Sequence, residues 1–278
     1  MHQKPGNTAI YFIIWLSSAL AGIFVFTDLQ ISLALVNESS GWANFLERFG
    51  ELPGILVLYI GTHIFLTRYR SDSKLQMIIV TMFLLIAVTF LSGYLTIVLY
   101  QGITDEYFFF QDNKILIIGV FAVLNLFVWI LLRRIEFPDT LLKFAKISML
   151  LGLYGYLLIV QPLKHLWGRF RFRDLDVIYS NFTPWFIPNG INGNQSFPSG
   201  HSAMAWMLLP LLVLAAHKSK SVKSILLSII IIWGLVVGTS RIVIGAHYAS
   251  DVLFGGLIII FVFLLIYKNY IIPQAKEK

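Results

Sequence analysis

Residues 114–132 read KILIIGVFAVLNLFVWILL, and the single charge in this stretch is its first residue. A helix of this length reaches across the ~30 Å hydrocarbon core of a lipid bilayer. Similar runs recur along the chain and are continuous rather than alternating, which predicts membrane-spanning helices. We expect eight helices, of which the second and sixth are short for a full crossing, at residues 9–27, 53–67, 75–100, 114–132, 144–163, 201–216, 222–239 and 252–268.

The composition of the whole chain is that of a polytopic membrane protein. Of its 278 residues, 58% are hydrophobic and only 13% are charged, which is too little charge to cover a soluble domain of this size. The predicted fold class is therefore all-α, a single transmembrane helical bundle over residues 1–278. The chain has no cysteine, which excludes disulfides and thiolate chemistry.

The net charge of +7 follows from where the basic residues lie. About two thirds of the 21 lysines and arginines fall on the predicted loops that share a side with the N-terminus. Such a bias marks cytoplasmic loops, so no nucleic-acid partner is expected. We predict cytoplasmic N- and C-termini and an integral location in a bacterial inner membrane. Several cations on the opposite side break this trend and need another explanation.

Those cations belong to two polar clusters that are predicted to lie at helix ends on the outer side. The long segment 164–200 begins with KHLWGRFR at residues 164–171 and ends in PSGH at residues 198–201. The second cluster reads Ser240-Arg241, then five residues, His247, three residues and Asp251. Ionisable residues at such positions in a membrane protein are costly and usually functional.

The residue types in these clusters suit phosphoryl transfer. His247 and Asp251 are four residues apart, so they share one helical face, and the carboxylate can orient the imidazole as a nucleophile. His201 could serve as the general acid. Backbone amides at Ser199 and Gly200 would form an anion site at a helix start. Three fixed cations would surround the phosphate oxygens, namely Lys164, Arg171 and Arg241.

At these positions the chain resembles the type 2 phosphatidic acid phosphatase superfamily. Its three motifs are Lys-x6-Arg-Pro, Pro-Ser-Gly-His and Ser-Arg-x5-His-x3-Asp, and the last two match in full. The first matches at Lys164 and Arg171, but Phe172 replaces the family's proline. Arg169 and Arg173 flank the assigned arginine, so the register of this motif is ambiguous. Each of the two either contacts a second phosphate or headgroup, or lies at a solvated rim.

The resemblance implies a metal-independent enzyme that needs no cofactor. It implies that His247 forms a phosphohistidine, that His201 protonates the leaving oxygen and that Asp251 orients the nucleophile. It assigns the phosphate to Lys164, Arg171, Ser199, Gly200 and Arg241. It also implies a six-helix core, here residues 75–268 with the motifs within 164–251, and two extra helices within residues 1–74.

The implied function is hydrolysis of the terminal phosphate of a lipid that enters from the outer leaflet. Candidate substrates are undecaprenyl diphosphate, phosphatidylglycerol phosphate and phosphatidic acid. Alternatives on the same scaffold are a phosphatase of lipid-A-type glycolipids, a phosphotransferase and a vanadate-dependent haloperoxidase. A non-catalytic lipid-binding or transport protein is the alternative from another class. The aromatic residues Trp167, Trp185 and Tyr248 are expected to be interfacial anchors.

Overall fold

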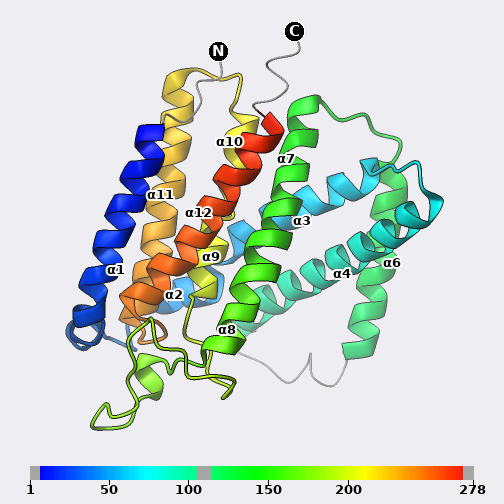
Figure 1. The fold of residues 1–278 in the computed structure, drawn as a ribbon. Helices are drawn as coiled ribbons and strands as arrows, with labels where there is room; N and C mark the ends of the chain where they lie inside the picture. Colours follow the sequence, from blue (N-terminus) through cyan, green and yellow to red (C-terminus); the bar gives the residue numbers. More distant parts are fainter. Residues whose placement is uncertain (1–6, 105–113, 272–278) are drawn as a thin grey trace.

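The computed structural model describes residues 7–104 and 114–271, and within these residues every regular element is helical (Figure 1). Seven of the helical stretches are long and apolar enough to cross a membrane. In chain order the elements are α1 (Asn7–Leu35), α2 (Gly41–Phe49), α3 (Leu52–Arg68), α4 (Lys74–Thr104), α6 (Lys114–Leu132), α7 (Asp139–Leu150), the π-helical segment η1 (Leu151–Val160), α8 (Gln161–Trp167), the 3-10 turn η2 (Phe172–Asp174), α9 (Gly200–Trp206), α10 (Leu211–Leu214), α11 (Lys220–Val243) and α12 (Ala249–Ile271).

The prediction of an all-α bundle is confirmed, and each of the eight expected segments contains helix. The second segment is longer than expected, because α2 and α3 together form a stretch over Gly41–Arg68. The sixth is the short one, over Gly200–Leu214. It breaks between α9 and α10 because Pro210 has no amide hydrogen to donate to the carbonyl of Trp206.

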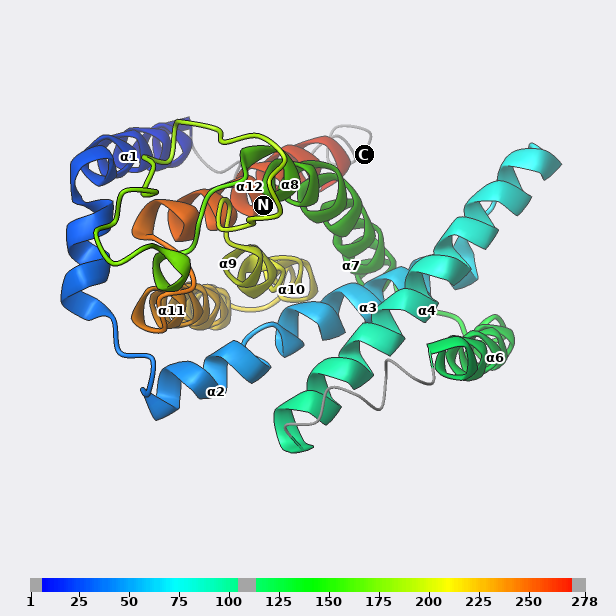
Figure 2. The ribbon, with the colours of Figure 1, turned by 90° about the horizontal axis from the view of Figure 1, so that it is seen from below.

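The short pair α9 and α10 forms the centre of the bundle (Figure 2). Helix α9 packs on α11, α12, α3 and η1, while α10 packs on α7 and α11. Buried side chains such as Met204 and Met207 join Ile55, Leu151 and Ile259 from the surrounding helices in one apolar core. The outermost helix of this group is α1, which packs on α12 and α11.

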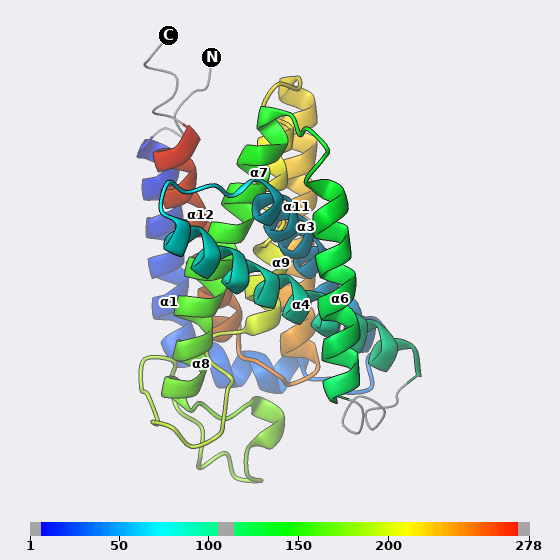
Figure 3. The ribbon, with the colours of Figure 1, turned by 90° about the vertical axis from the view of Figure 1, so that its right-hand side faces the viewer.

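Helices α4 and α6 lie at the edge of this bundle. Helix α4 crosses obliquely over α3 and α2, and α6 packs on α4 and α3 (Figure 3). The buried side chain of Asn125 in α6 fixes this contact, because it hydrogen-bonds to Ser92 of α4 and accepts a hydrogen bond from Tyr59 of α3. The division at residue 74 stays a prediction, and helix packing favours α4 and α6 as the peripheral pair.

The candidate site lies at one end of the bundle, where α8 ends and α9 and α12 begin (Figure 1). Helix α1 begins, and α12 ends, at the opposite end of the bundle. Local sequence fixes the ends near the site. Gly168 ends α8 in the left-handed conformation (φ 58°), and Ser199 caps α9 by accepting a hydrogen bond from the amide of Ser202.

Candidate active site

His247 lies in the tight turn between α11 and α12. Gly245 has a φ of 68°, a conformation that side chains disfavour, and it lets the amides of Ala246 and His247 both donate to the carbonyl of Arg241. The turn thereby places the second cluster's arginine and histidine side by side. The imidazole is 2% exposed, and its Nδ1 lies 3.7 Å from Oδ2 of Asp251, beyond hydrogen-bonding distance.

Burial lowers the pKa of His247 to about 3. Asp251 opposes this shift, while the nearby cations Lys164 and Arg241 add to it. The ring is therefore neutral at ordinary pH and keeps the lone pair that a nucleophile requires.

Asp251 is held rigidly from three directions. Its carboxylate accepts hydrogen bonds from Arg169 Nη1 at 2.6 Å, from Ser196 Oγ at 2.6 Å and from the amide of Tyr248 at 2.9 Å. The residue is completely buried. These partners leave Asp251 ionised and fixed beside the imidazole.

Arg169 lies neither at a rim nor against a free headgroup site. Its side chain is completely buried and bridges Asp251 to Asp28 of α1, with Nη2 at 3.0 Å from the second carboxylate. Ser250 hydrogen-bonds to both Asp28 and Arg169. The guanidinium also lies 4.0 Å from the ring centre of Tyr248. The expectation that Tyr248 is an interfacial anchor is wrong, because this ring is completely buried under the ion pairs.

His201 forms a second pair of histidine and carboxylate. Its Nδ1 lies 3.0 Å from Oε1 of Glu51, and its Nε2 lies 3.0 Å from the carbonyl oxygen of Glu47. An oxygen acceptor thus faces each ring nitrogen, and a ring that carries hydrogen on both nitrogens can donate to both acceptors. Glu51 is itself held by Tyr94 of α4, whose hydroxyl donates to Oε2 at 2.6 Å.

Of the predicted phosphate-binding residues, Lys164 and Arg241 lie within electrostatic reach of the His247 ring, whereas the amide of Ser199 is not open to a ligand because it donates to the carbonyl of Asp251 at 2.9 Å. Arg241 is 3% exposed, and its Nε and Nη1 have no hydrogen-bond partner among the described residues. The Nζ of Lys164 lies 3.3 Å from the point that a Cβ on Gly200 would occupy, so glycine leaves room for the lysine. The first amides of α9, beginning with Gly200, have no acceptor within the helix.

One carboxylate enters this cation cluster. Oε1 of Glu47 lies 3.2 Å from Arg241 Nη2 and 3.2 Å from Arg173 Nη1. Arg173 therefore pairs with α2, at the more exposed edge of the site. Glu47 satisfies one nitrogen of Arg241, and the other two have no partner in the described part of the chain.

Arg171 and Phe172 show how the first motif folds without its proline. Arg171 is half-buried, interacts electrostatically with Lys164 and has extended backbone (φ −75°, ψ 155°), the conformation that a following proline would impose. Phe172 is buried and packs its ring against Tyr179 and Tyr248. Aromatic packing thus takes the place of proline in fixing the turn. Of the three arginines here, Arg171 is the one that no carboxylate holds among the described residues.

The motifs did not reveal the acidic residues and the tyrosine that the first four helices contribute. These residues are Asp28, Glu47, Glu51 and Tyr94. Two of them carried a usable signal, because Asp28 and Glu51 border predicted membrane spans, where a buried charge needs a partner. The sequence did not indicate that Arg169 and His201, more than a hundred residues away, would be their partners.

Comparison with known proteins gave one family. The model of the PAP2 superfamily matches residues 145–271, from α7 to the end of α12, a range that includes all three motifs. No curated protein and no solved structure matches the chain.

Proposed function

We propose that this chain, which carries a PAP2 superfamily domain at residues 145–271, hydrolyses the terminal phosphate of a membrane lipid through a phosphohistidine. Membership of this superfamily implies phosphatase activity. The seven long apolar helices make the chain an integral membrane protein. The lipid substrate, the chemical roles of the residues and the orientation in the membrane are the proposed parts.

The observation that carries the proposal is the unsatisfied Arg241. A buried guanidinium with two nitrogens unpartnered among the described residues is costly, since each unpaired donor loses its solvation. Lys164 and Arg171 add positive charge close by. A phosphate group, which offers several anionic oxygens, satisfies all of these donors at once.

The first step uses the two histidines on opposite sides of the phosphorus. The lone pair of His247 attacks phosphorus, a P–N bond forms, and the bond from phosphorus to the lipid oxygen breaks. His201 gives its proton to the departing oxygen, which leaves as the lipid alcohol, or as the lipid monophosphate from a diphosphate. Asp251 stabilises the positive charge that develops on the attacking ring.

The second step reverses these roles. Water attacks the phosphohistidine, its proton passes to the now neutral His201, and the P–N bond breaks. Inorganic phosphate leaves, and both rings return to their starting forms.

The proposed substrates are undecaprenyl diphosphate, phosphatidylglycerol phosphate and phosphatidic acid. The alternatives are a phosphatase of lipid-A-type glycolipids and a phosphotransferase, which differ from this proposal only in the headgroup or the acceptor. We also propose that the site faces the extracytoplasmic side and that both termini are cytoplasmic. The basic residues of the loops between α3 and α4 and between α6 and α7 support this orientation.

The test is phosphate release by purified protein in detergent with EDTA present, for the wild type and His247→Gln. The panel contains the three proposed lipids and lipid A. We expect release by the wild type and a loss of at least about a thousandfold in the variant. His165→Gln is the matched control, because His165 is exposed and bonds only Gln195 among the described residues.

Other outcomes separate the alternatives. Phosphorylated lipid without free phosphate would identify a phosphotransferase. An enzymatic role would be contradicted if neither the wild type nor the variant released phosphate or transferred it, although both were folded and bound the lipids.

A further inference from the structure

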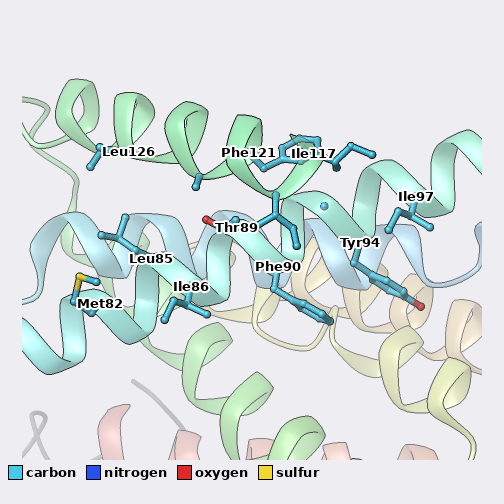
Figure 4. A pocket seen from close by; sticks show the side chains of 13 residues that line it. Met82, Leu85, Ile86, Thr89, Phe90, Tyr94, Ile97, Ile117, Phe121 and Leu126 are labelled. Carbon is cyan, nitrogen blue, oxygen red and sulfur yellow. The ribbon is translucent and has the colours of Figure 1, made fainter. Parts of the chain in front are cut away.

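An apolar groove runs between α4 and α6, with a volume of about 630 Å³ (Figure 4). Ile117 and Phe121 of α6 face α4 across it. Its lining is hydrocarbon apart from the hydroxyls of Thr89 and Tyr94. Both helices are long and apolar enough to cross the membrane, so the groove lies at the depth of the lipid chains.

The groove is open to lipid along α4. Met82 is 55% exposed, Ile86 is 65% exposed and Phe90 is 69% exposed. The ring of Phe90 lies parallel to that of Tyr94, with 6.3 Å between the ring centres. The apolar surface therefore continues from the lipid-facing side of α4 to Tyr94.

Tyr94 connects this groove to the candidate active site. Its ring lines the groove, while its hydroxyl points away from α6 and donates to Glu51 at 2.6 Å. Glu51 in turn lies 3.0 Å from His201. Two polar contacts thus join the groove wall to the proposed acid.

The direction of phosphoryl transfer selects this groove over another. Attack and departure occur roughly in line, so the lipid leaves on the side of the acid, opposite the nucleophile. A second apolar groove of about 730 Å³ lies between α1 and α12. It is lined by Trp185 and Phe254, the latter one turn after Asp251, and so it lies nearer to the carboxylate partner of the nucleophile than to the acid. Of these two grooves, the one between α4 and α6 is connected to the acid, through Tyr94 and Glu51.

We infer that the groove between α4 and α6 binds the hydrocarbon chain of the lipid phosphate while its phosphate lies between His201 and His247. This inference rests on the proposed function and adds a binding site for the apolar part of the substrate. The occupant is a long acyl or polyprenyl chain, because the lining offers almost no polar partner.

Gly93 allows a direct test, because it lines the groove and a Cβ added there meets no atom within 4 Å. Gly93→Leu should fill the groove without disturbing helix packing. The substrates are two pairs with matched headgroups: short-chain against long-chain phosphatidic acid, and farnesyl against undecaprenyl diphosphate. We expect the preference for the long chain, as a ratio of kcat/KM values, to fall about tenfold, since each lost methylene contact weakens binding.

Two glycine-to-leucine variants serve as controls. Gly22 lines the groove between α1 and α12, and Gly119 lies exposed on α6 outside both grooves, and neither has an atom within 4 Å of an added Cβ. Both variants should keep the wild-type ratio. If Gly93→Leu destabilises the protein, Ala122→Phe fills the same groove from the α6 side and should give the same fall.

The outcomes separate this inference from the function on which it rests. If active Gly93→Leu and Ala122→Phe proteins kept the wild-type ratio of kcat/KM values, the assignment of the groove would be overturned but the proposed function would stand. A fall in this ratio for Gly22→Leu instead would assign the hydrocarbon chain of the substrate to the groove between α1 and α12. A wild type that hydrolyses neither member of either pair would overturn the proposed function itself.

Discussion

The bundle around α9 and the peripheral pair α4 and α6 differ in the polar groups that they bury. Around α9 the structure buries Asp28, Arg169 and Asp251 together, with each charge held by at least one opposite charge. In the contact between α4 and α6 the buried polar groups are neutral, the amide of Asn125 and the hydroxyl of Ser92, and most of the surrounding lining is hydrocarbon. We propose that the first region fixes charges around an anion and that the second lies in lipid.

This difference has an energetic consequence. A buried charge that loses its partner is strongly destabilising, whereas a lost hydrogen bond between membrane helices costs little. Substitutions in the bundle should therefore affect both stability and chemistry. Those in the peripheral pair should affect which lipid is preferred.

Arg169→Leu should cause the largest loss of stability. It leaves Asp28 and Asp251 buried without their cation, which costs about 3–5 kcal/mol. The measurement is thermal unfolding in detergent. Arg173→Leu is the matched control, because its ion pair with Glu47 is about 30% exposed and should contribute less than about 1 kcal/mol. Equal shifts in both variants would contradict the proposed bracing of Asp251.

Glu51→Gln should lower kcat about a hundredfold on a lipid phosphate, because it weakens the positioning of His201 as an acid. A purely structural role would lower all rates alike. We therefore expect a much smaller loss with p-nitrophenyl phosphate, whose leaving group needs no proton. Tyr94→Phe removes only the outer hydrogen bond and should show the same pattern more weakly.

Acid should destabilise the protein through His247. The pKa of this ring falls from 6.5 to about 3 on burial, so between these values the unfolded chain binds a proton that the folded one does not. The contribution is fully present above pH 6.5 and is lost as the pH falls, by at most about 1.4 kcal/mol per pH unit. In His247→Gln the drop in melting temperature between pH 7 and pH 5 should be smaller than in the wild type.

Asn125→Leu should have the smallest effect. It removes the hydrogen bonds to Ser92 and Tyr59 but leaves α6 apolar, at a cost of about 0.6 kcal/mol for each bond. Hydrolysis of short-chain phosphatidic acid should be unchanged within error. A loss of stability as large as that of Arg169→Leu would contradict the difference between the two regions.

The contrast also explains what could be predicted from the sequence. Long apolar runs determine helices one by one, so all eight segments were predictable from residues close together in the chain. The cluster from Arg241 to Asp251 was predictable for the same reason, since one turn and one helix start place its members together. Pairs such as Asp28 with Arg169 and Glu51 with His201 depend on how distant helices pack, and no local pattern encodes this.

Arg169 shows the limit most clearly. By spacing it was one of three arginines around the first motif, and nothing in that run distinguishes a bridging arginine from a solvated one. Its burial follows from the carboxylate of α1, 141 residues earlier in the chain. The peripheral position of α4 and α6 was equally hidden, because their hydropathy resembles that of the helices in the bundle.

The most direct test of the central proposal, that His247 carries the phosphoryl group, is to trap it. Wild-type protein and His247→Gln would be mixed with phosphatidic acid labelled in its phosphate, quenched in alkali within one turnover and analysed by mass spectrometry. We predict an acid-labile phosphate on residue 247 of the wild type and none in the variant. Rapid phosphate release without any labelled protein, or a label on another residue, would contradict it.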